Sequence, residues 1–218
     1  YTRDNVRESN AHLVITVEED KTFWDWLTGK RKFTSGRIHT AGNIQLKYGR
    51  IEARIQVPNP ANGLWPSVSL LGANVDTVGW PNSGSMTLMQ MGSAEALQLG
   101  QANSRVGSAI HWERNGQAKS DSDEFNTKKD LAGGFHTYAM DWTPTSITTF
   151  VDDVPILTKD ISESACPNCD EFHHSYFLIL SVAVGGTFTG ITNAGDVTAS
   201  FPAEMKVDYV KIFDNGHT

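Results

Sequence analysis

The sequence predicts an all-β protein built from two packed antiparallel sheets. Short segments that alternate apolar and polar residues, or that are rich in β-branched and aromatic residues, are separated by Gly and Pro. This is the pattern of strands joined by turns. No segment offers a long helical repeat of 3.6 residues. Many strands with short connections favour a two-sheet sandwich.

Nine segments are predicted to be strands. In chain order they are His12–Val17, Tyr48–Val57, Val68–Leu71, Met86–Met91, Val106–Trp112, His136–Trp142, Ile147–Val151, Tyr176–Val184 and Met205–Phe213. The nearest helical candidate is Ser93–Gln101. Because Gly100 stands near its end, we expect only one or two helical turns there.

Length and charge limit the organisation and the partners. The 218 residues fit one domain, 1–218, because β-sandwiches commonly reach about 200–250 residues undivided. The net charge of −7 disfavours nucleic acid, because phosphate binding requires a concentrated basic face. No apolar run approaches the roughly 20 residues that cross a bilayer. A neutral partner is favoured, and the oligomeric state is left open.

The cysteines Cys166 and Cys169 stand in the sequence C-P-N-C. Two ligands cannot complete a structural zinc site, and no βαβ pattern indicates a thioredoxin-like motif. We therefore predict a disulfide that closes a small loop. The nearby His173 and His174 could bind a transition metal, but paired loop histidines are usually solvated.

Tryptophan is abundant for a chain of this length. The six are Trp24, Trp26, Trp65, Trp80, Trp112 and Trp142. Indole rings stack on sugars, because a pyranose presents a plane of C–H groups to a π-surface. Core packing is the alternative for each of them, and Trp142, in an apolar-flanked strand, is the expected core member.

A series of motifs runs through nearly the whole chain. They are Tyr48-Gly49-Arg50-Ile51-Glu52-Ala53-Arg54, Gly63-Leu64-Trp65-Pro66, Gly79-Trp80-Pro81, His111-Trp112, Phe135-His136-Thr137-Tyr138, Ala183-Val184-Gly185-Gly186 and Val207-Asp208-Tyr209-Val210. Together they resemble glycoside hydrolase family 16, the laminarinase-like β-1,3-glucanases. The resemblance implies a secreted jelly-roll sandwich with a concave cleft for a glucan chain. Family members usually begin with another strand, so we expect this chain to lack an N-terminal strand.

The family's catalytic strand reads E-x-D-x-x-E, and Ser85, Thr87 and Gln90 hold those three places here. Side chains 85 and 87 share one face of a strand. Position 90 would reach that face only across a β-bulge. Retaining glycosidases need two carboxyl groups about 5–5.5 Å apart. An amide has no proton to deliver, and Ser85 would need a base, which Thr87 is not. The resemblance therefore implies no catalytic residues.

Further cleft positions follow from the resemblance. Ser69 stands where the family commonly has Trp, and Ser181 stands where it commonly has Asn. The expected carbohydrate-binding residues are Arg37, Trp65, Ser69, Trp80, Ser85, Thr87, Gln90, His111, Trp112, His136 and Ser181. We expect no cofactor except a structural calcium ion, held by the Asp208 carboxylate and the Ala11 carbonyl.

Three functions remain in competition. The leading hypothesis is a catalytically inactive, lectin-like protein that binds β-1,3-glucan or a related oligosaccharide or polysaccharide. The second is weak hydrolysis or transglycosylation through Ser85 or a displaced carboxylate such as Glu95 or Asp76. The third is a sandwich reused for protein–protein interaction or defence. An engineered inactive mutant is a further alternative, against which Thr87, Ser69 and Ser181 argue.

Overall fold

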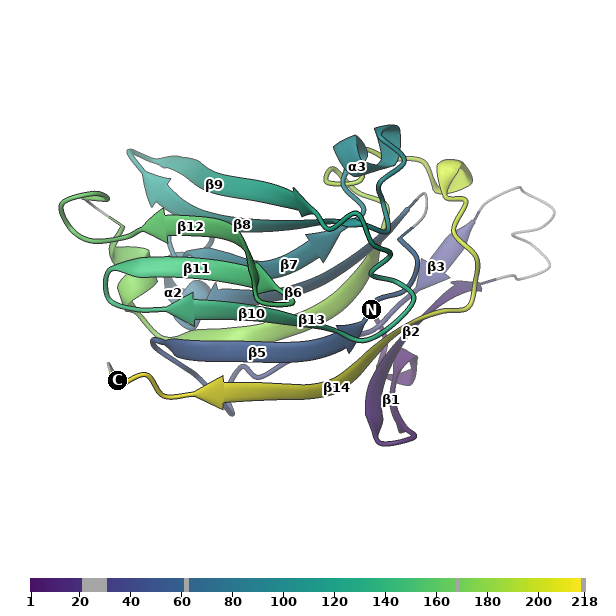
Figure 1. The fold of residues 1–218 in the computed structure, drawn as a ribbon, viewed down its shortest axis with the longest axis horizontal. Coiled ribbons are helices and arrows are strands. Elements are labelled where there is room, and N and C mark those ends of the chain that lie inside the picture. The colour runs from purple at the N-terminus through teal and green to yellow at the C-terminus, as the bar shows by residue number, and fades with distance from the viewer. Residues whose placement is uncertain (21–30, 61–62, 168, 217–218) are drawn as a thin grey trace.

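A computed structural model describes residues 1–20, 31–60, 63–167 and 169–216. Its strands form two antiparallel sheets that lie one over the other (Figure 1). The eight-stranded sheet has the order β1-β2-β14-β5-β10-β11-β12, with β3 paired to β2. Its strands are β1 (Val6–Ser9), β2 (His12–Asp20), β3 (Lys32–Thr34), β5 (Gly49–Gln56), β10 (His136–Trp142), β11 (Ser146–Val151), β12 (Val154–Asp160) and β14 (Ala203–Phe213).

The six-stranded sheet carries the residues of functional interest. Its order is β4-β13-β6-β7-β8-β9. The strands are β4 (Arg37–His39), β6 (Leu64–Gly72), β7 (Ser85–Met91), β8 (Arg105–Arg114), β9 (Gln117–Asn126) and β13 (Tyr176–Val184). The strands β6 to β9 are consecutive in the chain, whereas β13 comes from far along it to lie between β4 and β6. The fold class predicted from the sequence, a two-sheet jelly-roll sandwich, is confirmed.

The core lies between the two sheets. Along β6 buried and partly exposed residues alternate, with Leu64, Val68 and Leu70 fully buried. Neighbouring side chains on a strand point to opposite faces, so the intervening residues face outward. Trp142 is fully buried, and its indole N–H donates to the Phe172 carbonyl. The expectation that Trp142 belongs to the core is confirmed.

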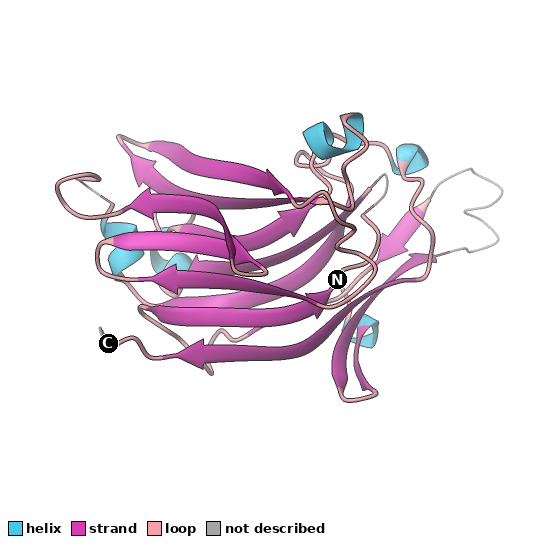
Figure 2. Ribbon diagram, in the orientation of Figure 1, coloured by secondary structure: helices cyan, strands magenta, loops and turns pink. Residues whose placement is uncertain are grey.

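Among the described residues, helix occurs in short pieces between long strands (Figure 2). The α-helices are α2 (Val75–Val78) and α3 (Ala94–Gln98). The hydroxyl of Ser93 caps α3 by accepting the Ala96 N–H. The expected short helix near 93–101 is confirmed, whereas α2 was not expected. Short 3-10 helices cover Arg3–Asn5, Asp170–His173 and Ala194–Asp196.

All nine predicted strands are present, and the predicted disulfide joins Cys166 to Cys169. Five strands were missed: β1, β3, β4, β9 and β12. In the described part of the chain, no helix is long and apolar enough to cross a membrane. Two of the six tryptophans, Trp24 and Trp26, lie outside the described residues.

Candidate functional site

The outward face of the six-stranded sheet presents a row of small polar side chains. Ser69 of β6 lies opposite Thr87 of β7, which in turn lies opposite Ala109 of β8. On the other side of β6, Ser67 lies opposite Ser181 of β13, with their hydroxyl oxygens 3.2 Å apart. The side chains on this face are therefore small, and many of them carry hydroxyl groups.

A β-bulge in β7 sets the direction of Gln90. The pairing of β7 with β8 shifts between Thr87 and Gln90, and the two residues between them, Leu88 and Met89, are both fully buried. The extra residue returns Gln90 to the face that Ser85 and Thr87 occupy. The bulge that the family resemblance implied at this place is confirmed.

Gln90 belongs to an aromatic group. The indole N–H of Trp65 donates to the Gln90 side-chain oxygen at 3.2 Å. The Trp65 ring also stacks on Phe188, with ring centroids 4.8 Å apart and planes 27° apart. Phe188 was not identified from the sequence, although an aromatic residue in the Gly186–Gly190 loop was an available signal. One face of Trp65 is thus already covered by a second aromatic ring.

Ser85 lies between two ring nitrogens. The Trp80 indole N–H donates to the Ser85 hydroxyl at 3.3 Å, and His111 Nδ1 is 3.5 Å from the same oxygen. Burial lowers the pKa of His111 below its ordinary value, so the imidazole is neutral near pH 7. His111 is therefore a base within reach of the Ser85 hydroxyl. Sequence reasoning did not identify this contact. In the described residues, no carboxylate bonds to the other imidazole nitrogen.

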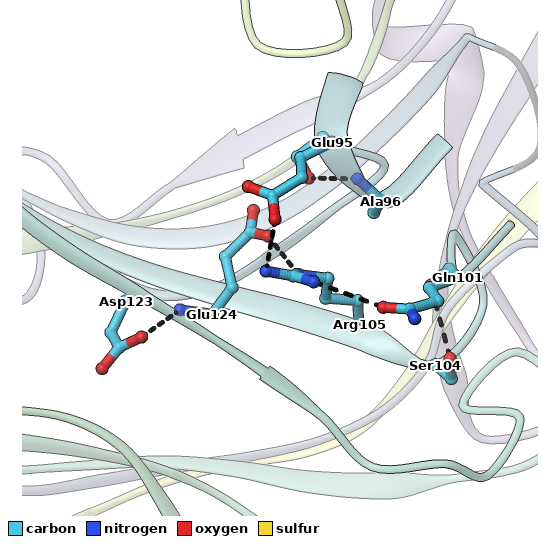
Figure 3. Close-up of polar contacts among 8 residues, drawn as sticks. Glu95, Ala96, Gln101, Ser104, Arg105, Asp123 and Glu124 are labelled. Atoms are coloured by element: carbon cyan, nitrogen blue, oxygen red, sulfur yellow. Dashed lines mark hydrogen bonds and ion pairs between the residues drawn. The ribbon is translucent and has the colours of Figure 1, made fainter. Parts of the chain in front are cut away.

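A cluster of charged side chains around Arg105 lies at the side of the same face (Figure 3). Arg105 of β8 bonds to Glu124 of β9 at 2.5 Å and to Glu95 of α3 at 2.9 Å. It also donates to the Gln101 side chain at 3.3 Å. One guanidinium therefore ties α3 to both strands, as Figure 3 shows. Neither Arg105 nor Glu124 was singled out from the sequence, because their proximity depends on strand pairing.

These groups line one groove of about 640 Å³. Trp65, Gln90 and Phe188 lie along it with Glu95, Arg105, Glu124 and His111. Gly107 belongs to the groove lining, and an added Cβ atom there would lie 3.3 Å from Glu124 Cγ and 3.6 Å from Gln90 Cγ. Glu124 and Gln90 therefore flank the same glycine.

The family model named glycosyl hydrolases family 16 matches residues 1–211. The chain belongs to this family. It is 28% identical to the clotting factor G alpha subunit of Tachypleus tridentatus, covering all of this chain and 29% of that protein. It is 31% identical to a β-1,3-glucan-binding protein of Penaeus monodon, covering 71% of this chain and 47% of that protein. The chain thus spans less than half of either relative.

A solved structure similar to this family 16 chain is the GH16 protein of the mixed linkage glucan PUL of Bacteroides ovatus, in complex with the product G4G4G3G. The TM-score is 0.84 with 31% identity, covering 98% of this chain and 87% of that one. The likeness extends over the whole sandwich, so the jelly-roll expectation holds for both sheets.

Most of the expected carbohydrate-binding residues share one face of this family 16 sandwich. Three of them line the groove: Trp65, Gln90 and His111. Four more lie on the same sheet: Ser69, Ser85, Thr87 and Ser181. Trp80 donates a hydrogen bond to the Ser85 hydroxyl. Arg37 is different. It pairs with Ser181 across β4 and β13, but its side chain lines a separate cavity with Asp76. Glu95 lies in the groove, and Asp76 does not.

The expected role of Trp112 in the cleft is wrong. Trp112 is 8% exposed and belongs to the core, where its ring packs against Phe172 with centroids 6.0 Å apart. The reason is strand alternation: Trp112 follows His111 directly, so the two side chains point to opposite faces of β8.

His136 also lies apart from the groove. It belongs to β10 of the eight-stranded sheet, and its Nδ1 is 2.6 Å from Asp152 Oδ2. The groove residues come instead from the six-stranded sheet and its loops. The expectation that His136 lies in the cleft is therefore wrong, because β10 belongs to the other sheet. The carboxylate of Asp152, in an adjoining turn, holds its imidazole.

The expected calcium ligand Asp208 already has a cationic partner. Arg54 donates to its carboxylate at 2.5 Å. A calcium ion would have to replace that contact, and calcium at this place stays a prediction. Both ring nitrogens of His173 have partners, the Tyr48 hydroxyl and the Ile161 carbonyl. Among the described residues, no group of three or more His, Cys, Asp or Glu side chains is arranged to hold a metal ion.

Replacing Arg105 by Ala should lower the free energy of unfolding by about 1–2 kcal/mol, as measured by urea denaturation. This loss lies between those typical of exposed and of buried ion pairs. The Arg105 side chain is only 19% exposed, and its loss leaves Glu95 and Glu124 without their shared cation. The matched control is Lys206→Ala, which removes a more exposed pair with Glu204. Equal effects of the two substitutions would contradict the structural role of the cluster.

Proposed function

We propose that this family 16 chain is a secreted, lectin-like protein that binds β-1,3-glucan or a related β-glucan in the groove without hydrolysing it. The observation that carries the proposal is the position of Gln90, which lies on the groove face and accepts a hydrogen bond from Trp65. Its amide can bond a sugar hydroxyl through both the N–H and the oxygen. It has no acidic proton for a departing glycosidic oxygen.

The rest of the groove suits a neutral sugar chain. Trp65 and Phe188 supply aromatic surface, and hydroxyl groups such as those of Ser120 and Ser122 also line the groove. Sugars require this combination, because their C–H planes are apolar while their hydroxyls need polar partners.

Two of the groove carboxylates are poorly placed for hydrolysis. Glu95 and Glu124 both bond to Arg105 at the side of the groove. Retaining chemistry requires one carboxylate that attacks the sugar and a second carboxyl group that protonates the opposite side of the bond. Two carboxylates bound to a single guanidinium support wall and helix packing instead.

The contact between Ser85 and His111 is the observation that favours residual enzyme activity as a second candidate. His111 can accept the hydroxyl proton as a general base. Attack of the serine oxygen on the anomeric carbon would, however, form an O-glycoside of the same bond type as the substrate. Such an intermediate is no easier to hydrolyse, so turnover would stop.

One relative supports glucan recognition, because it carries the name of a β-1,3-glucan-binding protein. The solved GH16 relative supports a glucan ligand, because it was obtained with an oligosaccharide product. Secretion is supported by the disulfide between Cys166 and Cys169, since disulfides persist in oxidising compartments.

Binding to insoluble β-1,3-glucan in a pull-down, followed by tryptophan fluorescence titration with laminari-oligosaccharides, tests the proposal. We expect saturable binding by both methods. The absence of binding at millimolar oligosaccharide, with none to other β-glucans on a glycan array, would overturn the proposal and favour a protein-interaction role.

A further inference from the structure

Ser85 and His111 form a pair whose chemistry sugar binding does not need. The strands β7 and β8 are neighbours in the six-stranded sheet (Figure 1), and their register places the two residues directly opposite each other. Side chains at opposed positions of antiparallel strands have Cβ atoms about 4.5–5.5 Å apart. The pair is therefore held by the pairing of two strands and not by a loop.

The hydrogen bonds around Ser85 determine the direction of its hydroxyl hydrogen. The Trp80 indole N–H, which can only donate, donates to the Ser85 oxygen at 3.3 Å. Because the oxygen accepts from Trp80, its own hydrogen is free to point toward His111 Nδ1, which is 3.5 Å away. Catalytic hydrogen bonds are often this long before a substrate binds and shorten in the complex. The imidazole is thus placed to take the hydroxyl proton.

His111 is also suited to act as a base. Burial lowers the pKa of its imidazole, so the ring is uncharged near neutral pH and can accept a proton. The Trp80 ring lies against the imidazole, with centroids 5.9 Å apart and planes inclined by 55°. Ser85, His111 and Trp80 therefore bring together a nucleophile, a base and an N–H donor. We call these three residues the serine cluster.

The kind of bond attacked decides whether the serine cluster can turn over. A serine bonded to an anomeric carbon is an ordinary glycoside and stays in that form. A serine bonded to an acyl group is an ester, and water can attack its carbonyl carbon with the same imidazole as the base. The serine cluster is therefore suited to an acyl ester and not to a glycosidic bond.

The surroundings of the serine cluster suit an ester that is carried by a sugar. His111 also lines the groove of about 640 Å³, where Ser120 and Ser122 supply hydroxyl groups. The outward residues beside the pair, Thr87 on β7 and Ala109 on β8, lie opposite each other and are small. A short acyl group such as acetyl is thus the kind of substituent that this part of the face can accept.

We propose that the serine cluster hydrolyses O-acetyl esters of sugar hydroxyl groups, with Ser85 as the nucleophile and His111 as the general base. The Trp80 N–H, which lies 3.3 Å from the attacking oxygen, supplies a donor for the oxyanion that forms on the ester carbonyl. The assignment to a sugar ester rests on the proposed function of the groove. The acyl transfer rests on the serine cluster alone.

The reaction proceeds in two steps that return the protein to its starting form. The Ser85 oxygen attacks the carbonyl carbon while His111 Nδ1 takes its proton, and the bond to the sugar oxygen then breaks as His111 gives that oxygen the proton. Acetyl-Ser85 remains. Water attacks the acetyl carbonyl with His111 again as the base, and acetate leaves as Ser85 regains its proton.

Hydrolysis of p-nitrophenyl acetate tests the acyl transfer without a sugar. We expect the wild type to release p-nitrophenol about 10²-fold faster than Ser85→Ala, the lower end of the contribution of one general base. His111→Asn should be equally slow. The control is His174→Asn, which removes an exposed imidazole and should keep the full rate. Equal rates for the wild type and Ser85→Ala would overturn the proposal.

The pH dependence identifies the base even if His111→Asn does not fold. The pKa of His111 lies below its ordinary value of 6.5. The Ser85-dependent rate should therefore be constant above that pH and should fall at lower pH, where the imidazole gains a proton. A Ser85-dependent rate that keeps rising well above that pH would contradict the role of His111.

A fluorophosphonate, which reacts with activated serines, should label the peptide that contains Ser85, as detected by mass spectrometry; labelling only elsewhere would overturn the proposal. O-acetylated laminari-oligosaccharides test the sugar. We expect the wild type to release acetate from them and Ser85→Ala not to do so. Hydrolysis of p-nitrophenyl acetate alone would overturn the assignment to a sugar ester. Failure of the groove proposal is distinguishable, since it would abolish laminari-oligosaccharide binding and leave p-nitrophenyl acetate hydrolysis intact.

Discussion

We expect the wild-type protein to release reducing ends from laminarin about 10⁴-fold more slowly than an active glucanase of the family at the same concentration. Loss of general acid–base assistance alone typically costs about 10²–10⁴-fold, and the proposed function also removes the carboxylate nucleophile. That proposal assigns the two catalytic places of the family to Ser85 and Gln90 of β7. A reducing-end assay over several hours checks this result, and turnover near that of the active enzyme would refute it.

Two variants show the origin of any residual activity. The triple substitution Ser85→Glu, Thr87→Asp and Gln90→Glu should give measurable but partial hydrolysis, because the small side chains of Ser69 and Ser181 would remain. Ser85→Ala should leave the background rate unchanged. A complete loss of background activity in Ser85→Ala would instead assign that activity to the Ser85–His111 contact.

Replacement of Trp65 by Ala should weaken the binding of laminari-oligosaccharides about 10–100-fold. The substitution removes the aromatic surface shared with Phe188 and the N–H that orients Gln90. Each of these interactions is worth roughly 0.5–1.5 kcal/mol. Calorimetric titration of wild type and variant gives the ratio of affinities. Trp65→Phe should fall between them, because it keeps an aromatic ring and loses the donor.

The matched control is Phe213→Ala, which removes a 47% exposed aromatic side chain from β14 of the other sheet. We expect it to bind as the wild type does. If both variants lost affinity equally, the groove would not be the binding site. Circular dichroism and thermal unfolding separate a loss of contacts from a loss of fold.

The sequence identified the strands that bury one face and missed those that do not. The strand β6 alternates buried and partly exposed residues over its whole length, which produces a clear period of two. The strand β9 is an edge strand with no fully buried residue, and its sequence QAKSDSDEFN is polar except for Ala118 and Phe125. Pairing with β8 forms β9, and no local pattern reports such pairing.

The candidate site was predicted to a similar extent. Spacing along one strand placed Ser85 and Thr87 on the same face, and the family resemblance added Gln90 with the bulge that turns it outward. The same alternation, applied to His111 and Trp112, would have excluded the tryptophan from the groove. The cluster of Arg105 could not be foreseen, because its partners come from a helix and a neighbouring strand whose pairing register only the fold reveals.

The bulge in β7 has a consequence for how this protein could change over generations. The backbone from Ser85 to Gln90 already presents three side chains on one side, so point substitutions at these positions change the groove face without a change of backbone. A single-residue deletion at Leu88 or Met89 would leave Gln90 two residues after Thr87, so regular alternation would keep it on the same face and only the bulge would be lost. Substitutions on this strand therefore change its outward chemistry, whereas such a deletion changes the local bend of the strand and leaves the outward side chains in place.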